Sequence, residues 1–212
     1  MRIILPKARE LTDWSAFTDW GWVMFTIGTF LGNAGVAVMF FYISFYPENQ
    51  KTTDTEMAFY MVPFFNAASC LGRVLPNALA DKTGPFNLIV PGSCVFGTLA
   101  LCMIAIETEA SLIVLAVLTG FFSGVYIALP PICFVALTED KTKIGSRLGM
   151  GYGIVAFGFL ASGPGGGNLL GKVDPLNWKG LWIFSGVLCC VSSLMYAGIR
   201  LGKYGPKLNV KA

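Results

Sequence analysis

Long stretches without charged side chains are the feature that most limits how this 212-residue chain can fold. A helix needs about 20 predominantly apolar residues to cross the hydrocarbon core of a bilayer. The sequence contains six stretches that meet this need, and Arg73 is the one charged residue inside any of them. The stretches are residues 20–47, 57–80, 83–106, 110–138, 148–171 and 180–199. This pattern predicts an all-α membrane protein with six transmembrane helices.

The composition argues against the two main alternatives. Only 13% of the residues are charged and 55% are hydrophobic, whereas about 25% of the residues in a typical soluble domain are charged. A soluble chain of this length would have to bury six charge-poor helices in one core, which is geometrically implausible. A β-barrel does not fit, because its strands are about 10 residues long and alternate between apolar and polar positions. The stretches are apolar on all sides, as expected of helices that face lipid and one another.

Positive charge is distributed unevenly between the two ends of the predicted helices. With a cytoplasmic N-terminus, the inner segments carry eleven of the fifteen Lys and Arg residues, and the outer loops carry Lys51, Lys172 and Lys179. Cytoplasmic loops of membrane proteins are enriched in Lys and Arg, so we expect both termini in the cytoplasm. The expected parts are a cytoplasmic segment 1–19, a membrane domain 20–200 with spans 20–46, 57–79, 86–106, 111–137, 148–171 and 179–200, and a basic cytoplasmic tail 201–212.

The sequence shows no arrangement of side chains that is typical of an enzyme or a metal site. It contains no histidine, which is the commonest general base and metal ligand. All six cysteines fall inside predicted spans, where we expect them to pack as small apolar residues rather than form disulfides. No nucleophile–base set and no phosphate-binding loop can be assembled. We therefore predict no enzymatic activity, no metal and no cofactor, and we interpret the basic tail as a membrane-flanking anchor, not as a nucleic-acid patch.

Glycine and proline are concentrated in the predicted spans. Gly28, Gly32 and Gly35 give the first span a face of small residues, which favours close contact with another helix. Pro130–Pro131 in the fourth span and Gly163–Pro164 in the fifth predict hinges, because proline removes a backbone donor and glycine bends easily. The glycines are compatible both with static packing and with helices that slide or rock.

Residues 77–84 join the second and third predicted spans and read Asn-Ala-Leu-Ala-Asp-Lys-Thr-Gly. This segment resembles the loop signature G-x-x-x-D-R/K-x-G of the major facilitator superfamily. Asp81, Lys82 and Gly84 match the signature, whereas Asn77 replaces its first glycine and Pro-Phe replaces the basic pair that usually follows. The position between the second and third of six spans makes the match more specific than the motif alone.

The wider sequence is similar to the fungal monocarboxylate-transporter-like branch of this superfamily, over essentially the whole chain. The supporting segments are Leu11-Thr12-Asp13, residues 40–42, Asn66-Ala67-Ala68-Ser69, residues 143–150 and Gly163-Pro164. The resemblance implies the C-terminal half of a twelve-span secondary carrier, that is, one half of a major-facilitator-type bundle. It also implies alternating-access transport of a small organic anion such as a monocarboxylate, with protons or by facilitated diffusion, across the plasma membrane.

Arg73 is the charged residue that needs an explanation within the membrane. It lies about two helical turns, roughly 12 Å, from the inner end of its span. A charge at such a depth costs about 2.5–3.5 kcal/mol, and a guanidinium can bind a carboxylate through two parallel hydrogen bonds. The resemblance implies a substrate-binding arginine here, four residues after an aspartate whose place Ser69 occupies in this chain. That change leaves anion binding possible but removes the support for proton coupling. An arginine that snorkels to the inner surface is the alternative.

Asn33, Asn66, Ser69 and Tyr126 are further candidates for the substrate-binding site, because polar side chains within spans can line a cavity. Each could instead donate or accept a hydrogen bond between helices, which is the commoner role of such residues.

A gate is expected at the inner ends of the spans, formed by Asn77, Asp81, Lys82 and Gly84 together with Arg147 at the start of the fifth span. In the resembled superfamily, the aspartate of this motif approaches a helix N-terminus of the opposite half. Such a charge–dipole contact contributes about 0.3–1 kcal/mol or more. That helix would not belong to these six spans.

Two functions remain open at this point. Transport by alternating access needs two halves that move around a shared site, so the expected partners are the bilayer, the anion, and a separate half-transporter or a second copy of this chain. The alternative is a truncated, non-transporting membrane protein that acts through helix-mediated protein interaction.

Overall fold

The computed structural model describes residues 12–173 and 175–205 of the chain. Every regular element within these residues is a helix, and six of the helices are long and apolar enough to cross a membrane. They are α1 (Trp20–Tyr42), α3 (Thr55–Thr83), α4 (Phe86–Cys102), α5 (Glu109–Leu137), α6 (Ile144–Leu170) and α7 (Trp178–Tyr204). The predicted all-α membrane fold with six spans is confirmed. The expected terminal segments, 1–19 and 201–212, lie partly outside the described residues.

Three short elements complete the described chain. A 3-10 helix, η1 (Trp14–Thr18), precedes α1, and a second one, η2 (Met103–Ala105), extends α4. The expected first span, 20–46, is divided, because α1 ends at Tyr42 and the separate helix α2 (Phe45–Gln50) follows. Pro47 lies in the first turn of α2, where its missing N–H costs no intrahelical hydrogen bond.

Polar side chains fix the ends of several membrane helices. The Asp19 carboxylate accepts a hydrogen bond from the Gly21 N–H at the start of α1, at 3.1 Å. The Asn177 side chain accepts one from the Gly180 N–H at the start of α7, at 2.9 Å. These contacts satisfy backbone donors that have no partner inside the helix. The helices therefore begin where the apolar stretches meet polar residues.

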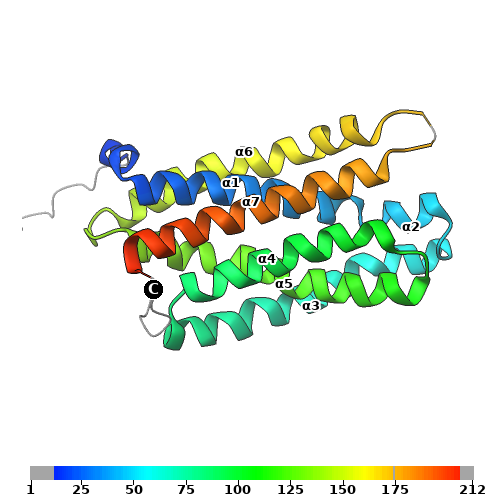
Figure 1. Ribbon diagram of the computed structural model, residues 1–212, viewed down its shortest axis with the longest axis horizontal. Helices are drawn as coiled ribbons and strands as arrows, with labels where there is room; N and C mark the ends of the chain where they lie inside the picture. The colour runs from blue at the N-terminus through cyan, green and yellow to red at the C-terminus, as the bar shows by residue number, and fades with distance from the viewer. Residues whose placement is uncertain (1–11, 174, 206–212) are drawn as a thin grey trace, which may run out of the picture.

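The six long helices pack in pairs that follow a two-fold pattern. α3 packs mainly on α5, α1 on α7 and α6, and α4 on α7 and α5, while α1 also contacts α5. Exchanging the first three helices (α1, α3, α4) with the last three (α5, α6, α7) turns each of these pairs into another pair of the same set. Each main contact therefore joins one helix of the first group to one of the second, as in an inverted repeat of three spans. α3 and α6 lie at opposite edges of the bundle (Figure 1).

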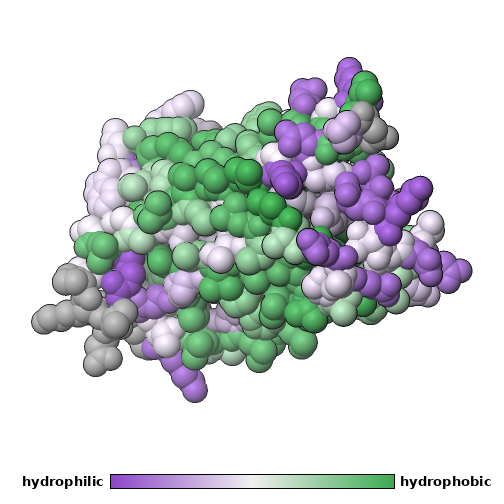
Figure 2. All heavy atoms as spheres, turned by 45° about the vertical axis from the view of Figure 1, so that its right-hand side comes forward, coloured by the Kyte–Doolittle hydropathy of each residue, from purple (hydrophilic) through white to green (hydrophobic). Residues whose placement is uncertain are grey.

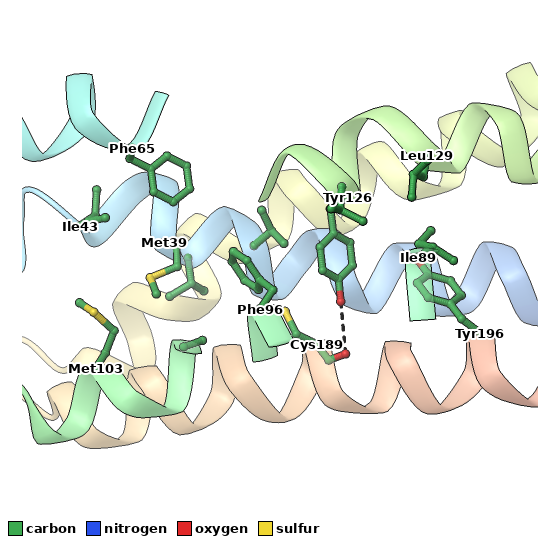
Figure 3. Packing of buried hydrophobic residues seen from close by; sticks show 14 of the residues in the cluster. Met39, Ile43, Phe65, Ile89, Phe96, Met103, Tyr126, Leu129, Cys189 and Tyr196 are labelled. Atoms are coloured by element: carbon green, nitrogen blue, oxygen red, sulfur yellow. Dashed lines mark hydrogen bonds between the residues drawn. The ribbon is translucent and has the colours of Figure 1, made fainter. Parts of the chain in front are cut away.

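Aromatic and aliphatic side chains fill the centre of the bundle (Figure 3). The ring of Phe25 in α1 packs edge-on against Phe134 of α5, with centroids 4.8 Å apart. The small-residue face of α1 packs closely on α7, as predicted: a Cβ atom at Gly35 would lie 2.6 Å from the Sγ atom of Cys189. The Ser185 hydroxyl of α7 donates a hydrogen bond to the Gly35 carbonyl at 2.7 Å. Close backbone approach and buried hydroxyl contacts are typical of helix packing in membranes.

The outer surface agrees with a bilayer environment. Hydrophobic side chains cover the middle of the face drawn in Figure 2, and hydrophilic side chains gather at its ends. Many large apolar side chains on this outer surface are exposed, among them Phe157 at 69% and Leu160 at 72% on α6. Water would disfavour such a surface, whereas hydrocarbon does not.

Candidate functional site

The two flanks of α3 differ in chemistry on either side of the stripe that packs on α5. Asn66, Arg73 and Asn77 follow one another at intervals of seven and four residues, so they share one flank. Leu75 and Leu79 lie on the other flank, where they line an apolar groove together with residues of α4 and α5. The polar flank is therefore turned away from α4.

Arg73 is exposed on this polar flank. It lies ten residues before the last residue of α3, Thr83, which is about 15 Å along the helix axis at 1.5 Å per residue. Within the described part of the chain, its guanidinium has no hydrogen-bond or ion-pair partner. A cation at this depth with all its donors available can bind an anion that reaches the flank.

Asn66 lies two turns outward from Arg73 on the same flank. Its side chain is exposed, and its Nδ2 atom donates a hydrogen bond to the Val62 carbonyl at 3.0 Å. Within the described chain, the Asn66 Oδ1 atom accepts no hydrogen bond, so it remains available as an acceptor. Arg73 and Asn66 thus present donors and an acceptor on one surface.

Asn33 lies on the face of α1 that is turned toward α3 and α6. It lies seven residues before Phe40, so the two side chains share one face of α1. The Phe40 ring contacts Phe65 of α3 and Phe159 of α6, with centroids 4.8 and 6.3 Å away. Asn33 is partly buried, and its Nδ2 atom donates to the Thr29 carbonyl at 2.9 Å.

The structure places Ser69 and Tyr126 inside helix contacts. Ser69 is fully buried against α5, where the Ser123 hydroxyl donates to the Ser69 Oγ atom at 3.1 Å. Tyr126 is 1% exposed, and its hydroxyl donates to the Cys189 carbonyl at 3.2 Å (Figure 3). Of the sequence candidates, Arg73 and Asn66 therefore share one open surface, whereas Ser69 and Tyr126 connect α5 to its neighbours.

The residues expected at the gate lie at the C-terminal end of α3, the end that the sequence predicts on the inner side of the membrane. Asp81 and Lys82 are exposed in its last turn, and neither takes part in an ion pair among the described residues. Gly84 ends the helix with φ of 93°, and its N–H donates to the Ala80 carbonyl at 2.8 Å. A side chain at this φ would be strained, which explains the final glycine of the motif. Asn77 is partly buried, and its side-chain oxygen, Oδ1, has no hydrogen-bond partner in the described chain.

Arg147, the fifth expected gate residue, contacts the segment before α1 instead of the end of α3. Its Nε atom lies 2.9 Å from Asp13 Oδ2, and its Nη1 atom lies 3.3 Å from Asp19 Oδ2. Lys143 also pairs with Asp13, at 3.1 Å. Hydrogen bonds from the Ser15 hydroxyl, Arg147 and Lys143 lower the pKa of Asp13 well below the usual value of an aspartate.

Both expected hinges lie within uninterrupted helices. α5 continues from Glu109 to Leu137 through Pro130 and Pro131, and α6 continues from Ile144 to Leu170 through Gly163 and Pro164. At the second hinge, the Tyr42 hydroxyl of α1 donates to the Gly163 carbonyl at 3.0 Å. This hydrogen bond connects the C-terminal parts of α1 and α6.

Sequence reasoning missed the ion pairs of Asp13 and Asp19. Lys143 and Arg147 follow Asp13 at distances of 130 and 134 residues, so no local periodicity indicates these pairs. The sequence also gives no sign that Arg200, near the end of α7, is buried: it is only 8% exposed, and its Nε atom donates a hydrogen bond to Asn87 Oδ1 at 2.6 Å. The position of Asp13 and Asp19 just before the first span is the one local feature of the sequence that could have indicated these ion pairs.

Residues 12–173 and 175–205 contain no group of three or more His, Cys, Asp or Glu side chains placed to hold a metal ion. No protein-family model matches the chain.

Comparison with known proteins identifies fungal transporters as relatives. The chain is 53% identical over 194 residues to the MFS-type transporter dbaD of Emericella nidulans, an alignment that covers 92% of this chain and 44% of the relative. It is 30% identical to the aspyridones efflux protein apdF of the same organism, covering 92% and 40%, and 30% identical to the agnestins efflux protein AgnL12 of Paecilomyces divaricatus, covering 98% and 46%. The chain thus spans less than half the length of these proteins. Along nearly all of its own length, it is a relative of fungal MFS-type transporters.

Proposed function

We propose that the chain is one half of a major-facilitator-type carrier that moves an organic anion across a membrane, with Arg73 as the residue that binds the anion. The observation that carries this proposal is the exposed guanidinium about 15 Å from the inner end of α3, without a partner in the described chain. A carboxylate or an acidic hydroxyl group would supply the missing counter-charge. Asn66 and Asn33 would orient the rest of the solute through hydrogen bonds.

The names of the relatives support transport, and two of them support outward transport. The proteins of Emericella nidulans and Paecilomyces divaricatus are named as efflux proteins for aspyridones and agnestins. For this chain we extend the proposal to efflux of an organic acid, of which a monocarboxylate is the simplest example. The names of the relatives do not favour the alternative of a non-transporting membrane protein.

The carrier would be completed by a second set of six spans, supplied by another chain or by a longer form of this one. Asp81 and Lys82 would then meet the opposite half at the inner gate, and bends at Pro130–Pro131 and Gly163–Pro164 would permit the rocking motion. The uneven distribution of Lys and Arg supports cytoplasmic termini, and the plasma membrane is the proposed location.

Anion binding can be tested on the chain as it stands. We would purify it in detergent and measure its melting temperature with increasing concentrations of benzoate. A ligand that binds only the folded state raises this temperature. The Arg73→Gln variant should lose the rise, and Arg73→Lys should keep only part of it, because an ammonium cannot form the two parallel hydrogen bonds of a guanidinium.

Lys172→Gln is the matched control, because Lys172 is also exposed but lies in the loop after α6. It should respond to benzoate like the unmodified chain. Uptake of labelled benzoate into proteoliposomes, with and without a pH gradient, then tests transport and proton coupling. Equal stabilisation of the Arg73→Gln and Lys172→Gln variants by benzoate would remove Arg73 from the proposed site.

A further inference from the structure

A network of charged side chains joins the segment before α1 to the inner ends of two other helices. Asp13 receives hydrogen bonds from Lys143 and Arg147, which lie just before and in the first turn of α6. Asp19, the N-cap of α1, receives hydrogen bonds from Arg147 and from Lys203 in the last turn of α7, each at 3.3 Å. Arg147 is the centre of the network, because it binds both carboxylates.

The segment itself is folded against the bundle. Asp13 is 5% exposed, and its carboxylate also accepts hydrogen bonds from the backbone and hydroxyl of Ser15, at 3.3 and 2.6 Å. Ala16 is completely buried within η1. The backbone N–H of Asp13 lies 3.2 Å from the Sδ atom of Met150, one turn further along α6. Because the Asp13 carboxylate lies beside the first turn of α6, the dipole of this helix also stabilises it.

One side of the inner part of α6 is not packed against the bundle. A Cβ atom added at Gly145, Gly149 or Gly153 would meet no atom within 4 Å, so this side of the helix packs against nothing. α6 is also the most exposed of the six long helices, because only 17% of its tested apolar stretch of 18 residues is buried inside the bundle. The close contacts of α6 with α1 lie further outward, at Gly158 and at Gly163. On its other side, the inner part of α6 packs on Phe134 of α5, since a Cβ atom at Gly151 would lie 2.6 Å from the Cζ atom of that ring and Tyr152 also contacts it. Toward α1 and α7, however, the inner end of α6 is held mainly by the charged contacts.

We propose that residues 13–19 form an ionic latch that holds the inner end of α6 against α1 and α7. When the latch is intact, Arg147 bridges Asp13 and Asp19 and the three helix ends stay together. When its charges are removed or screened, the inner end of α6 separates from α1, while the outer contacts at Gly158 and Gly163 remain in place. The latch is a property of the described residues and does not depend on the proposed transport.

Hydrogen exchange followed by mass spectrometry tests the latch in the whole chain, reconstituted in nanodiscs of zwitterionic phosphatidylcholine. In the Asp13→Asn variant, amides of residues 144–153 should exchange about tenfold faster, since a hydrogen bond between charged groups contributes more than a neutral one. Amides of α4 and α7 should be unchanged. Glu139→Gln, which removes an exposed carboxylate from the loop before α6, is the matched control and should leave the exchange of residues 144–153 unchanged.

Two further measurements separate a latch from a general loss of structure. Raising the NaCl concentration should accelerate exchange of residues 144–153 in the unmodified chain but much less in the Asp13→Asn variant, because exposed parts of the network are screened. The double variant Asp13→Asn/Arg147→Gln should exchange less rapidly than the product of the two single effects predicts, because both act on one pair. Unchanged exchange at residues 144–153, purely multiplicative effects, or faster exchange along the whole chain would each overturn the latch.

Discussion

The contact between α3 and α5 depends on glycine, and Gly124→Ala should disrupt it. A Cβ atom at Gly124 would lie 2.5 Å from the carbonyl carbon of Gly72 and 2.7 Å from the Ser69 oxygen, both of them backbone atoms of α3. Ordinary contact begins at 3.4 Å, so α3 and α5 would have to separate by the difference between 3.4 and 2.5 Å, which is 0.9 Å. A Cβ atom at Gly72 would likewise collide with the backbone of Phe121, and one at Gly120 would collide with the backbone of Phe65.

The expected cost is at the upper end of the range for overpacking, about 3 kcal/mol, because a backbone cannot turn aside as a side chain can. We would measure it by equilibrium unfolding in mixed micelles with increasing SDS, followed by tryptophan fluorescence. Gly153→Ala is the control: its Cβ would meet nothing within 4 Å, and alanine is the better helix former, so its stability should change little or rise by up to about 1 kcal/mol. If Gly124→Ala and Gly153→Ala unfold at the same SDS fraction, the close packing of α3 on α5 is wrong.

Three further results are expected. Ser185→Ala removes the hydroxyl that binds the Gly35 carbonyl and should lower the free energy of unfolding by about 0.6 kcal/mol, measured by the same SDS titration; no loss at all would contradict the contact. The lowered pKa of Asp13 means that its stabilising effect is complete above about pH 4, the ordinary aspartate range, and is lost as the pH falls below it. The difference in melting temperature between the unmodified chain and Asp13→Asn should therefore shrink on acidification, and a constant difference would argue against an ionised Asp13. Maleimide should modify exposed Cys70 but leave buried Cys189 unmodified in the folded protein in detergent, as peptide mass spectrometry can show, and equal modification would contradict the packing of α7.

The sequence predicted the membrane helices well, because the free energy of burying apolar residues in hydrocarbon is local and additive along a span. It missed the break after Tyr42, because residues 43–47 remain uncharged while the backbone leaves α1 and enters α2. The stretch alone could not indicate that its last residues form a separate helix outside the span.

The candidate site was predicted only as far as helical periodicity reaches. Asn66 and Arg73 share a flank of α3 because seven residues make about two turns, which the sequence shows directly. The burial of Tyr126 against α7 and the pairing of Arg147 with Asp13 depend on which helices are neighbours. No local pattern encodes this information, so polarity alone could not separate a ligand-facing tyrosine from one that packs in the core.

The two-fold pairing of the helices has a consequence for biosynthesis. Each main contact joins a helix of the first group, α1, α3 and α4, to one of the second, α5, α6 and α7. Of these six spans, α1, α3 and α4 leave the ribosome before α5, α6 and α7, so they find few stable neighbours among themselves and stay in the bilayer as separate spans. Since α1 packs on both α6 and α7, the bundle can close only after the last helix is inserted. A nascent chain arrested after α4 should consequently remain loosely associated and open to proteolysis.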